Sequence, residues 1–411
     1  MNTRQQRQVS AVALTLAVIV AIVFLAYDRH SSTSPSASAA TPRPSVTVPP
    51  ASAPATTARK PAPPTTSNAP TTSTVPGSPA VDRPLRLVDR ITGEISPKSV
   101  DATGAGLVFA QNMMYRHTMT VYNDAGALVK TIPDSVDLAS FGYPGHAGLS
   151  RGAPVEGAVS PDHRFFYVTN YSMYGVDFGP EGSDDCSGPG GLSPSFVYRV
   201  ALKTLAITGV TQVGMVPKYI AVTPDNRYIL VTNWCSFDLS VIDRATFKEV
   251  KRIHLGTDPR GIAVNKASTV AYIAVMGSTE VARVDLRTFA LSWYQGVGLS
   301  PRHVVLDPTG RYLYVTLNGD SRVVKLDTAT GAVIARVATG EQPRSMTISP
   351  DGTALYVVNY ESNSITKLRA SDMSIVQTIA VPSHPIGITF EPSTRRLWVA
   401  CYSGEILVFD A

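Results

Sequence analysis

A basic residue follows each of five prolines that stand at matching places in the sequence. The five are Lys98, Lys218, Arg260, Arg302 and Arg344. Lysine and arginine bind carboxylate and phosphate groups, and arginine does so through two parallel hydrogen bonds. If the prolines begin equivalent elements, the five cations would converge and could hold one anionic or carbonyl-bearing ligand. The alternative is that each cation pairs with a nearby acid such as Asp258 or Glu341.

The residue that follows this position adds groups suited to proton transfer. Glu156, Tyr219 and His303 occupy it in three of the units. A histidine changes its charge near neutral pH, and an arginine beside it can stabilise an oxyanion. Arg302, His303 and Glu156 are therefore the candidate catalytic residues if the protein is an enzyme. With Tyr219, the five cations and His303 form the candidate ligand-binding channel mouth.

A repeat must position these side chains. Pro217, Pro259, Pro301, Pro343 and Pro385 are each 42 residues apart, and Pro154 and Pro97 begin two further units that carry insertions. Each unit contains short apolar or alternating runs that end at Pro, Gly, Asn or Asp, which is typical of strands and turns. Four strands per unit in seven units predict an all-β fold, a seven-bladed β-propeller.

The last unit tests the prediction, because after Pro385 it has room for only three strands, at 386–390, 396–401 and 405–409. Residues 87–100 align without a gap to residues 333–346, which form the outer strand of an earlier unit. We therefore expect an N-terminal outer strand to close the ring and remove its exposed edges. The propeller should span residues 85–411, with the residues after each repeat proline at the channel mouth.

Motifs on the second strands resemble a known family. Residues 167–170 read YVTN, and the equivalents are LVTN at 230–233, YVVN at 356–359 and YVTL at 314–317. With SPD or TPD turns before three of them, residues 86–411 resemble the YVTN-family, YncE-like propellers of the WD40/YVTN repeat-like superfamily. The resemblance implies the propeller fold, and it leaves the activity open because one fold hosts many functions.

One unit carries a second resemblance. Pro301-Arg302-His303, followed by Asp307-Pro308-Thr309-Gly310 and Tyr314-Val315, resembles a segment of seven-bladed lactonases of the 6-phosphogluconolactonase type. This would make Arg302 a clamp for a carboxylate or carbonyl and His303 a general base or acid, with Glu156 as its partner. The segment departs from those enzymes after the strand, where residues 317–320 lack their usual glutamate.

The N-terminal part predicts a membrane anchor. Residues 9–27 carry no charge and are long enough for a transmembrane signal-anchor helix. Arg4 and Arg7 precede this segment, so residues 1–8 should be cytoplasmic and the propeller extracytoplasmic; a cleaved signal peptide is the alternative. Residues 28–84 are rich in Pro, Ser, Thr and Ala, which predicts a disordered linker that acts as an extended spacer.

The charge distribution argues against nucleic-acid binding. The chain of 411 residues has a formal net charge of +5, but six basic residues and one acidic residue precede position 82. Residues 82–411 therefore carry 30 basic and 30 acidic residues, and this part of the chain is formally neutral. We expect an envelope protein, a glycan or a small anionic ligand as the partner, and no cofactor or metal, because no CxxC or HxH pattern occurs.

The cysteines agree with export. Cys186 lies in an insertion at 171–195, and Cys235 lies just past the LVTN strand of the next unit, so a disulfide between them is expected in an oxidising exterior. The insertion should flank the channel mouth as a lid or a partner-contact loop. We interpret the chain as a non-catalytic binding module at the cell envelope, with a lactonase-like hydrolase as the alternative.

Overall fold

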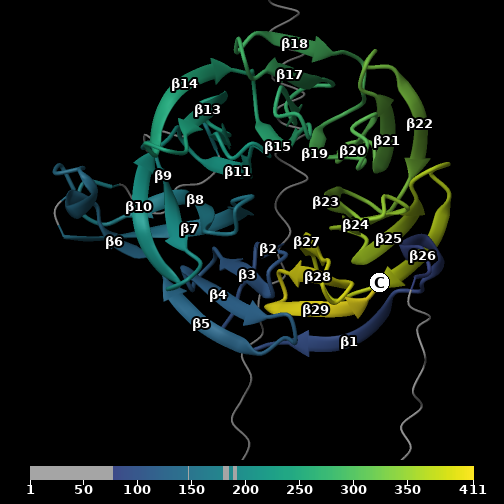
Figure 1. Cartoon of the computed structure of the whole chain (residues 1–411), viewed down its shortest axis with the longest axis horizontal. Helices are drawn as coiled ribbons and strands as arrows, with labels where there is room; N and C mark the ends of the chain where they lie inside the picture. The colour runs from purple at the N-terminus through teal and green to yellow at the C-terminus, as the bar shows by residue number, and fades with distance from the viewer. Residues whose placement is uncertain (1–76, 147, 179–184, 188–191) are drawn as a thin grey trace, which may run out of the picture. The chain divides into compact units, whose positions relative to one another are not determined.

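The computed structural model describes residues 77–411, except 147, 179–184 and 188–191. Seven antiparallel sheets are arranged around one axis, as Figure 1 shows. The sheets are blade 1 (β2–β5), blade 2 (β6–β10), blade 3 (β11–β14), blade 4 (β15–β18), blade 5 (β19–β22), blade 6 (β23–β26) and blade 7 (β27–β29 with β1). The predicted all-β, seven-bladed propeller is confirmed.

The innermost strand of every blade packs against the innermost strands of its two neighbours and so surrounds the axis. These strands are β2 (Ser99–Ala102), β7 (Leu149–Val159), β11 (Pro217–Val222), β15 (Pro259–Val264), β19 (Pro301–Leu306), β23 (Pro343–Ile348) and β27 (Pro385–Glu391). Five of them begin at the repeat prolines, as the sequence predicts.

The second strands contain the YVTN-like motifs and are almost entirely buried. They are β3 (Leu107–Asn112), β8 (Phe165–Tyr174), β12 (Tyr228–Asn233), β16 (Val270–Val275), β20 (Tyr312–Leu317), β24 (Ala354–Asn359) and β28 (Arg396–Cys401). The terminal asparagine is structural: Asn359 Nδ2 donates to Ser364 Oγ and Thr366 Oγ1 on the third strand. Cys401 takes this place in blade 7 as a buried free thiol.

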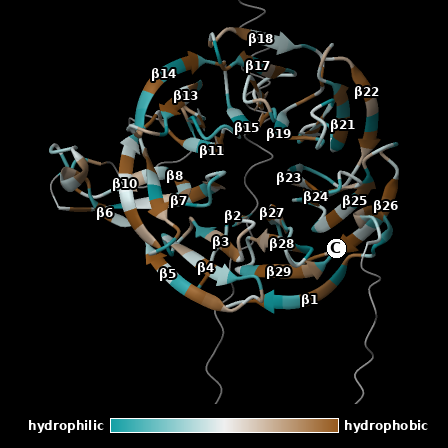
Figure 2. Cartoon of the chain, in the orientation of Figure 1, coloured by the Kyte–Doolittle hydropathy of each residue, from teal (hydrophilic) through white to brown (hydrophobic). Residues whose placement is uncertain are grey.

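The third and fourth strands complete the blades. The third strands are β4 (Thr118–Asn123), β9 (Phe196–Ala201), β13 (Asp238–Asp243), β17 (Val281–Asp285), β21 (Arg322–Asp327), β25 (Ser364–Arg369) and β29 (Glu405–Asp410). The fourth strands are β5 (Leu128–Pro133), β10 (Ala206–Gln212), β14 (Lys248–His254), β18 (Leu291–Tyr294), β22 (Val333–Ala338) and β26 (Ile375–Ala380). Figure 2 shows hydrophobic and hydrophilic residues alternating along these outer strands, because one face of each packs inward.

An N-terminal strand closes the ring. β1 (Arg86–Ile91) pairs antiparallel with β29 and is the fourth strand of blade 7 (Figure 1). Residues 78–85, here called the N-terminal strap, precede it and include the short 3-10 helix η1 (Ala80–Asp82). The strap is fixed to blade 6, where the fully buried Lys367 donates through Nζ to the carbonyls of Ala80 and Arg83.

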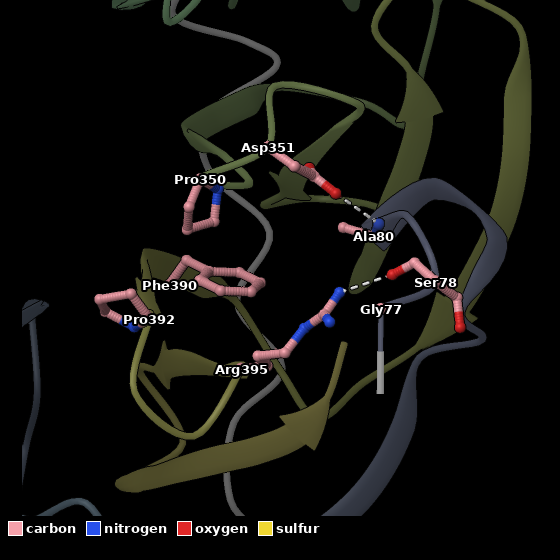
Figure 3. A pocket seen from close by; sticks show the side chains of 8 residues that line it. All are labelled: Gly77, Ser78, Ala80, Pro350, Asp351, Phe390, Pro392 and Arg395. Atoms are coloured by element: carbon pink, nitrogen blue, oxygen red, sulfur yellow. Dashed lines mark hydrogen bonds between the residues drawn. The ribbon is translucent and has the colours of Figure 1, made fainter. Parts of the chain in front are cut away.

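The two faces of the ring differ. We call the face where the inner strands begin the loop face, and the face with the turns between first and second strands the turn face. The strap contacts the turn face: Ala80 N donates to Asp351 at 2.7 Å, and Arg395 donates to the Ser78 carbonyl at 2.8 Å. Figure 3 shows these contacts around a pocket of about 270 Å³. The strap therefore lies on the side of the propeller opposite the candidate channel mouth.

The predicted membrane segment lies outside the described residues. Residues 9–27, and most of the linker at 28–84, belong to the part that the structure does not describe. Among the described residues, no helix is both long and apolar enough to cross a bilayer.

Candidate functional site

Four of the five cations lie at bulges at the start of inner strands, and the fifth, Lys98, directly precedes β2. In β19 the register passes from Pro301 opposite Leu317 directly to His303 opposite Thr316, so Arg302 is left out of the ladder. β11 does the same at Lys218, and β15 and β23 do so around their arginines. A bulge re-aims a side chain and ends regular pairing. Blades 3 to 6 therefore present their cations at the loop face by the same kind of bulge.

The cations are buried, and their charges interact with one another. Lys98, Lys218, Arg260 and Arg302 are each at most 7% exposed. Burial, together with the guanidinium groups of Arg260 and Arg344, holds the pKa of Arg302 well below its usual range. Burial and two of the arginines lower the pKa of Lys98 to about 8, even though the charge of Glu156 opposes this. The predicted convergence of basic residues therefore exists across several blades.

Glu156 is the anionic member of the group, and its carboxylate is engaged. Its Oε1 lies 3.0 Å from Lys98 Nζ, with only 12% and 5% of the two side chains exposed. The two residues come from neighbouring blades, since Lys98 precedes β2 and Glu156 lies on β7. For Lys98, the structure therefore shows the alternative in which a cation of the channel mouth pairs with an acid.

His303 is held as a neutral ring. Its Nδ1 accepts the Met346 backbone N–H at 3.3 Å, so the ring proton lies on Nε2, which is 2.9 Å from the Tyr219 hydroxyl. Burial and the charges of Arg302, Arg260 and Lys98 lower the pKa of His303 to about 3. The imidazole is therefore an uncharged hydrogen-bonding group at neutral pH, and its lone pair is already directed at the backbone.

Asp101 belongs to the same cluster and escaped the sequence analysis. It lies on β2, where burial and the charge of Glu156 raise its pKa well above the ordinary value. Gln111 sits between Ser99 and Asp101, with its amide nitrogen 3.1 Å from the Asp101 carboxylate in the orientation that satisfies both groups. Asp101 is the fourth residue after Pro97 and so lies beyond the two positions that the repeat pattern singles out.

Aromatic side chains pack among the cations and were also missed. They are Tyr171, Trp234, Tyr360 and Tyr402, which we call the aromatic collar, and each follows directly after a second strand or its YVTN-like motif. Lys218 Nζ is 4.3 Å from the Tyr171 ring centre and 5.1 Å from that of Trp234, and Arg344 is 3.9 Å from that of Tyr360. Reading the residue after each motif would have found them, because these residues reach the same face as the cations.

The insertion of blade 2 is attached beside the collar. A disulfide joins Cys186 to Cys235, and Cys235 directly follows Trp234. The second insertion contains β6 (Ser135–Asp137) and the 3-10 helix η2 (Leu138–Phe141). This insertion contacts the one at 171–195 through His146, whose ring stacks on that of Phe178 with 4.3 Å between the ring centres. The two insertions therefore form one packed protrusion on blade 2.

The structure gives no metal centre of the usual kind in the part of the chain that it describes. There, no group of three or more His, Cys, Asp or Glu side chains is placed to hold an ion. At the loop face, the cations can hold an anion, and His303 and Tyr219 can donate or accept hydrogen bonds.

Comparisons with known proteins give a matching family and similar solved structures. The family described as "Lactonase, 7-bladed beta-propeller" matches residues 150–376. Among solved structures, the hydrazine synthase of Kuenenia stuttgartiensis is similar with a TM-score of 0.61 at 18% sequence identity. The similarity covers 77% of this chain and 96% of that one, and at this identity it shows the fold alone. No curated protein sequence matches the chain.

Proposed function

The chain belongs to the seven-bladed β-propeller lactonase family, and we propose that its loop face binds a small anionic ligand without transforming it. The observation that carries the proposal is the mutual proximity of buried cations. Arg302 is 3% exposed, and burial together with two neighbouring guanidinium groups lowers its pKa. Holding like charges together costs free energy, and a bound carboxylate or phosphate would offset that cost.

The state of His303 favours binding over hydrolysis. A general base needs a free lone pair and a pKa close to the working pH. The Nδ1 lone pair of His303 accepts a backbone N–H, and the pKa of the ring is about 3. Glu156 is paired with Lys98. These two residues therefore serve better as positioning groups for a ligand than as acid and base.

The test is anion binding by the full chain in detergent. Gluconate, citrate and phosphate would be titrated calorimetrically at low and at physiological salt. Arg302→Met should weaken binding at least tenfold, since it removes a charge-assisted contact. The exposed Arg287→Gln on the outside of blade 4 is the matched control and should not change affinity. No binding of any anion, or equal binding by Arg302→Met, would contradict the proposal.

Lactone hydrolysis is the second candidate, and family membership favours it. In this proposal Arg302 would polarise the lactone carbonyl, and His303 and Glu156 would transfer the proton. The bound ligand would first displace the groups that His303 and Glu156 contact in this structure. The measurement is turnover of a panel of sugar lactones. Hydrolysis that disappears in His303→Ala and persists in Arg287→Gln would overturn the binding-only proposal. Absence of turnover across the panel would count against the enzyme.

We propose further that the propeller is displayed outside the cell on the N-terminal segment. The uncharged run at residues 9–27, the linker composition and the YVTN-like motifs support a membrane-anchored, YncE-like envelope module. A disulfide between Cys186 and Cys235 agrees with an oxidising compartment. The loop face would then be available to a ligand, glycan or envelope protein outside the cell. Digestion of intact cells by an added protease tests the orientation: a propeller protected until lysis would contradict it.

A further inference from the structure

A carboxylate without hydrogen-bond partners is buried at the end of β5. Asp134 has no exposed surface, and neither of its carboxylate oxygens makes a hydrogen bond within the described residues. An unpaired carboxylate in the interior costs several kcal/mol, so it either keeps a proton or finds a partner that supplies positive charge. Burial is the cause that raises its pKa, and no lysine or arginine acts on it there.

The repeat shows what this position ordinarily holds. Asp134 N–H donates to the carbonyl of the residue just before the third strand, His117. The same backbone hydrogen bond is made in other blades by Leu255, Val297, Thr339 and Val381. Blades 3 to 6 therefore place an aliphatic or methyl-bearing side chain where blade 1 places a carboxylate. The packing of the fold does not require an acid at this position.

A second acceptor converges on the same point. A Cβ atom on Gly152 would lie 2.3 Å from Asn170 Oδ1 and 2.8 Å from Asp134 Oδ2, so both oxygens face the space beside this glycine. Asn170 Oδ1 is buried and makes no hydrogen bond, and its Nδ2 donates to the Phe196 carbonyl at 3.4 Å. Asn233 and Asn359 also have an unpaired Oδ1, but beside their neighbouring glycines no carboxylate is found.

We propose that Asp134 and Asn170 hold a buried metal cation that prefers oxygen ligands, Ca²⁺ or Na⁺. Asp134 Oδ2 and Asn170 Oδ1 face the space beside Gly152, and neither they nor Asp134 Oδ1 makes a hydrogen bond within the described residues. Hard cations are bound by carboxylate and amide oxygens. A proton on Asp134 could donate one hydrogen bond, but it would leave one of the three buried oxygens without a partner. The site joins the end of β5 to β7 and β8, the strands that also carry Glu156 and lead to Tyr171.

The cation would therefore fix the blade that bears the insertions and one side of the loop face. Gly152 N–H donates to the Asp134 carbonyl at 2.9 Å, so β7 is attached to the same corner by its backbone. Glu156 follows four residues later on β7 and pairs with Lys98. Filling the site should stiffen this strand and support the ion pair at the loop face.

Thermal unfolding of the full chain tests the site. The protein would be treated with EDTA, exchanged into a choline buffer, and melted with added CaCl₂, with NaCl, or with choline chloride of equal ionic strength. A cation present at 100 times its Kd raises Tm by several degrees for a domain of this size. A shift with Ca²⁺ alone identifies a calcium site, and a shift with Na⁺ identifies a sodium site.

Two variants decide whether the response arises at Asp134. Asp134→Val installs the side chain that blade 4 carries at Val297 and should fold, yet lose the cation response completely. Gly152→Ala should lose it because the new Cβ would occupy the space of the ion. Asp137→Asn, an exposed residue that keeps its role as N-cap of η2, should respond like the wild type. No shift with either cation, or a shift that persists in Asp134→Val, would overturn the proposal.

Discussion

The imidazole Nε2 of His303 lies 2.9 Å from the hydroxyl of Tyr219, although the two residues come from blades 5 and 3. The residue at the same repeat position in the intervening blade 4 is Gly261. Its missing side chain allows the close approach, since a Cβ there would lie 2.8 Å from His303 Cα. Three equivalent positions of the repeat therefore act together: Tyr219 supplies a phenol, Gly261 leaves space, and His303 supplies an imidazole.

Tyr219→Phe should leave the His303 Nε2–H buried without an acceptor. An unsatisfied buried donor costs about 1–3 kcal/mol, so chemical denaturation should show a loss in that range. Anion affinity should fall as well, because the ring of His303 is no longer oriented. Tyr228→Phe removes a hydroxyl in the same blade, outside the site, and is the control. Equal losses in both variants would mean that the Tyr219 hydroxyl has no special role.

Gly261→Ala should disturb the loop face through packing alone. The new methyl group would press on backbone atoms of Arg302 and His303 at 2.8–3.0 Å. Overpacking of this kind costs typically 1–3 kcal/mol. We expect lower stability and a weakened Tyr219–His303 contact, seen as a changed chemical shift of the His303 ring. Gly310→Ala in an open turn is a control for the loss of a glycine, although its φ of +74° carries its own cost.

Stability should fall in acid partly because of His303. Its pKa is about 3 in the folded protein and 6.5 when exposed, so the unfolded chain binds the proton first. The contribution of His303 to the unfolding free energy is complete above pH 6.5. It is lost as the pH falls toward 3, and the unfolding free energy then drops by about 1.4 kcal/mol per pH unit. His303→Gln should flatten the curve of unfolding free energy between pH 6 and 4. A curve parallel to that of the wild type would contradict the assignment.

Loss of the disulfide should destabilise the blade 2 insertion. Cys186 and Cys235 are 49 residues apart, and closing a loop of that length is worth about 4 kcal/mol in the chain-entropy account. Cys186→Ser should lower the unfolding free energy by up to that amount and make the insertion sensitive to protease. Cys401→Ala removes the free thiol and should leave the insertion protected.

Lys367→Met should release the N-terminal strap. Lys367 Nζ donates to carbonyls of Ala80 and Arg83, whereas Lys325, one repeat earlier, donates to the carbonyls of Ala370 and Ser371 within the propeller. Both substitutions remove two hydrogen bonds, which makes Lys325→Met the matched control. Only Lys367→Met should expose the Arg86–Leu87 bond, at the end of the strap, to trypsin. Equal cleavage rates in the two variants would show that the strap is held by its other contacts.

The sequence by itself determined the fold and the location of the cations. Strand boundaries, the 42-residue repeat and the closing β1 strand follow from local patterns of apolar residues, turns and prolines, which act over a few residues. The same repeat placed Lys98, Lys218, Arg260, Arg302 and Arg344 at one face. These are consequences of periodicity, and periodicity is visible without coordinates.

Only the tertiary structure decided which side chains meet. The pairing of Glu156 with Lys98, the reach of Tyr219 across Gly261 to His303, and the convergence of Asp134 with Asn170 each join residues from different blades or strands. Such contacts depend on the angle between blades and on side chains too small to fill a gap. Burial also lowers the pKa of His303 and raises that of Asp101, because desolvation depends on what surrounds a group and not on its neighbours in the chain.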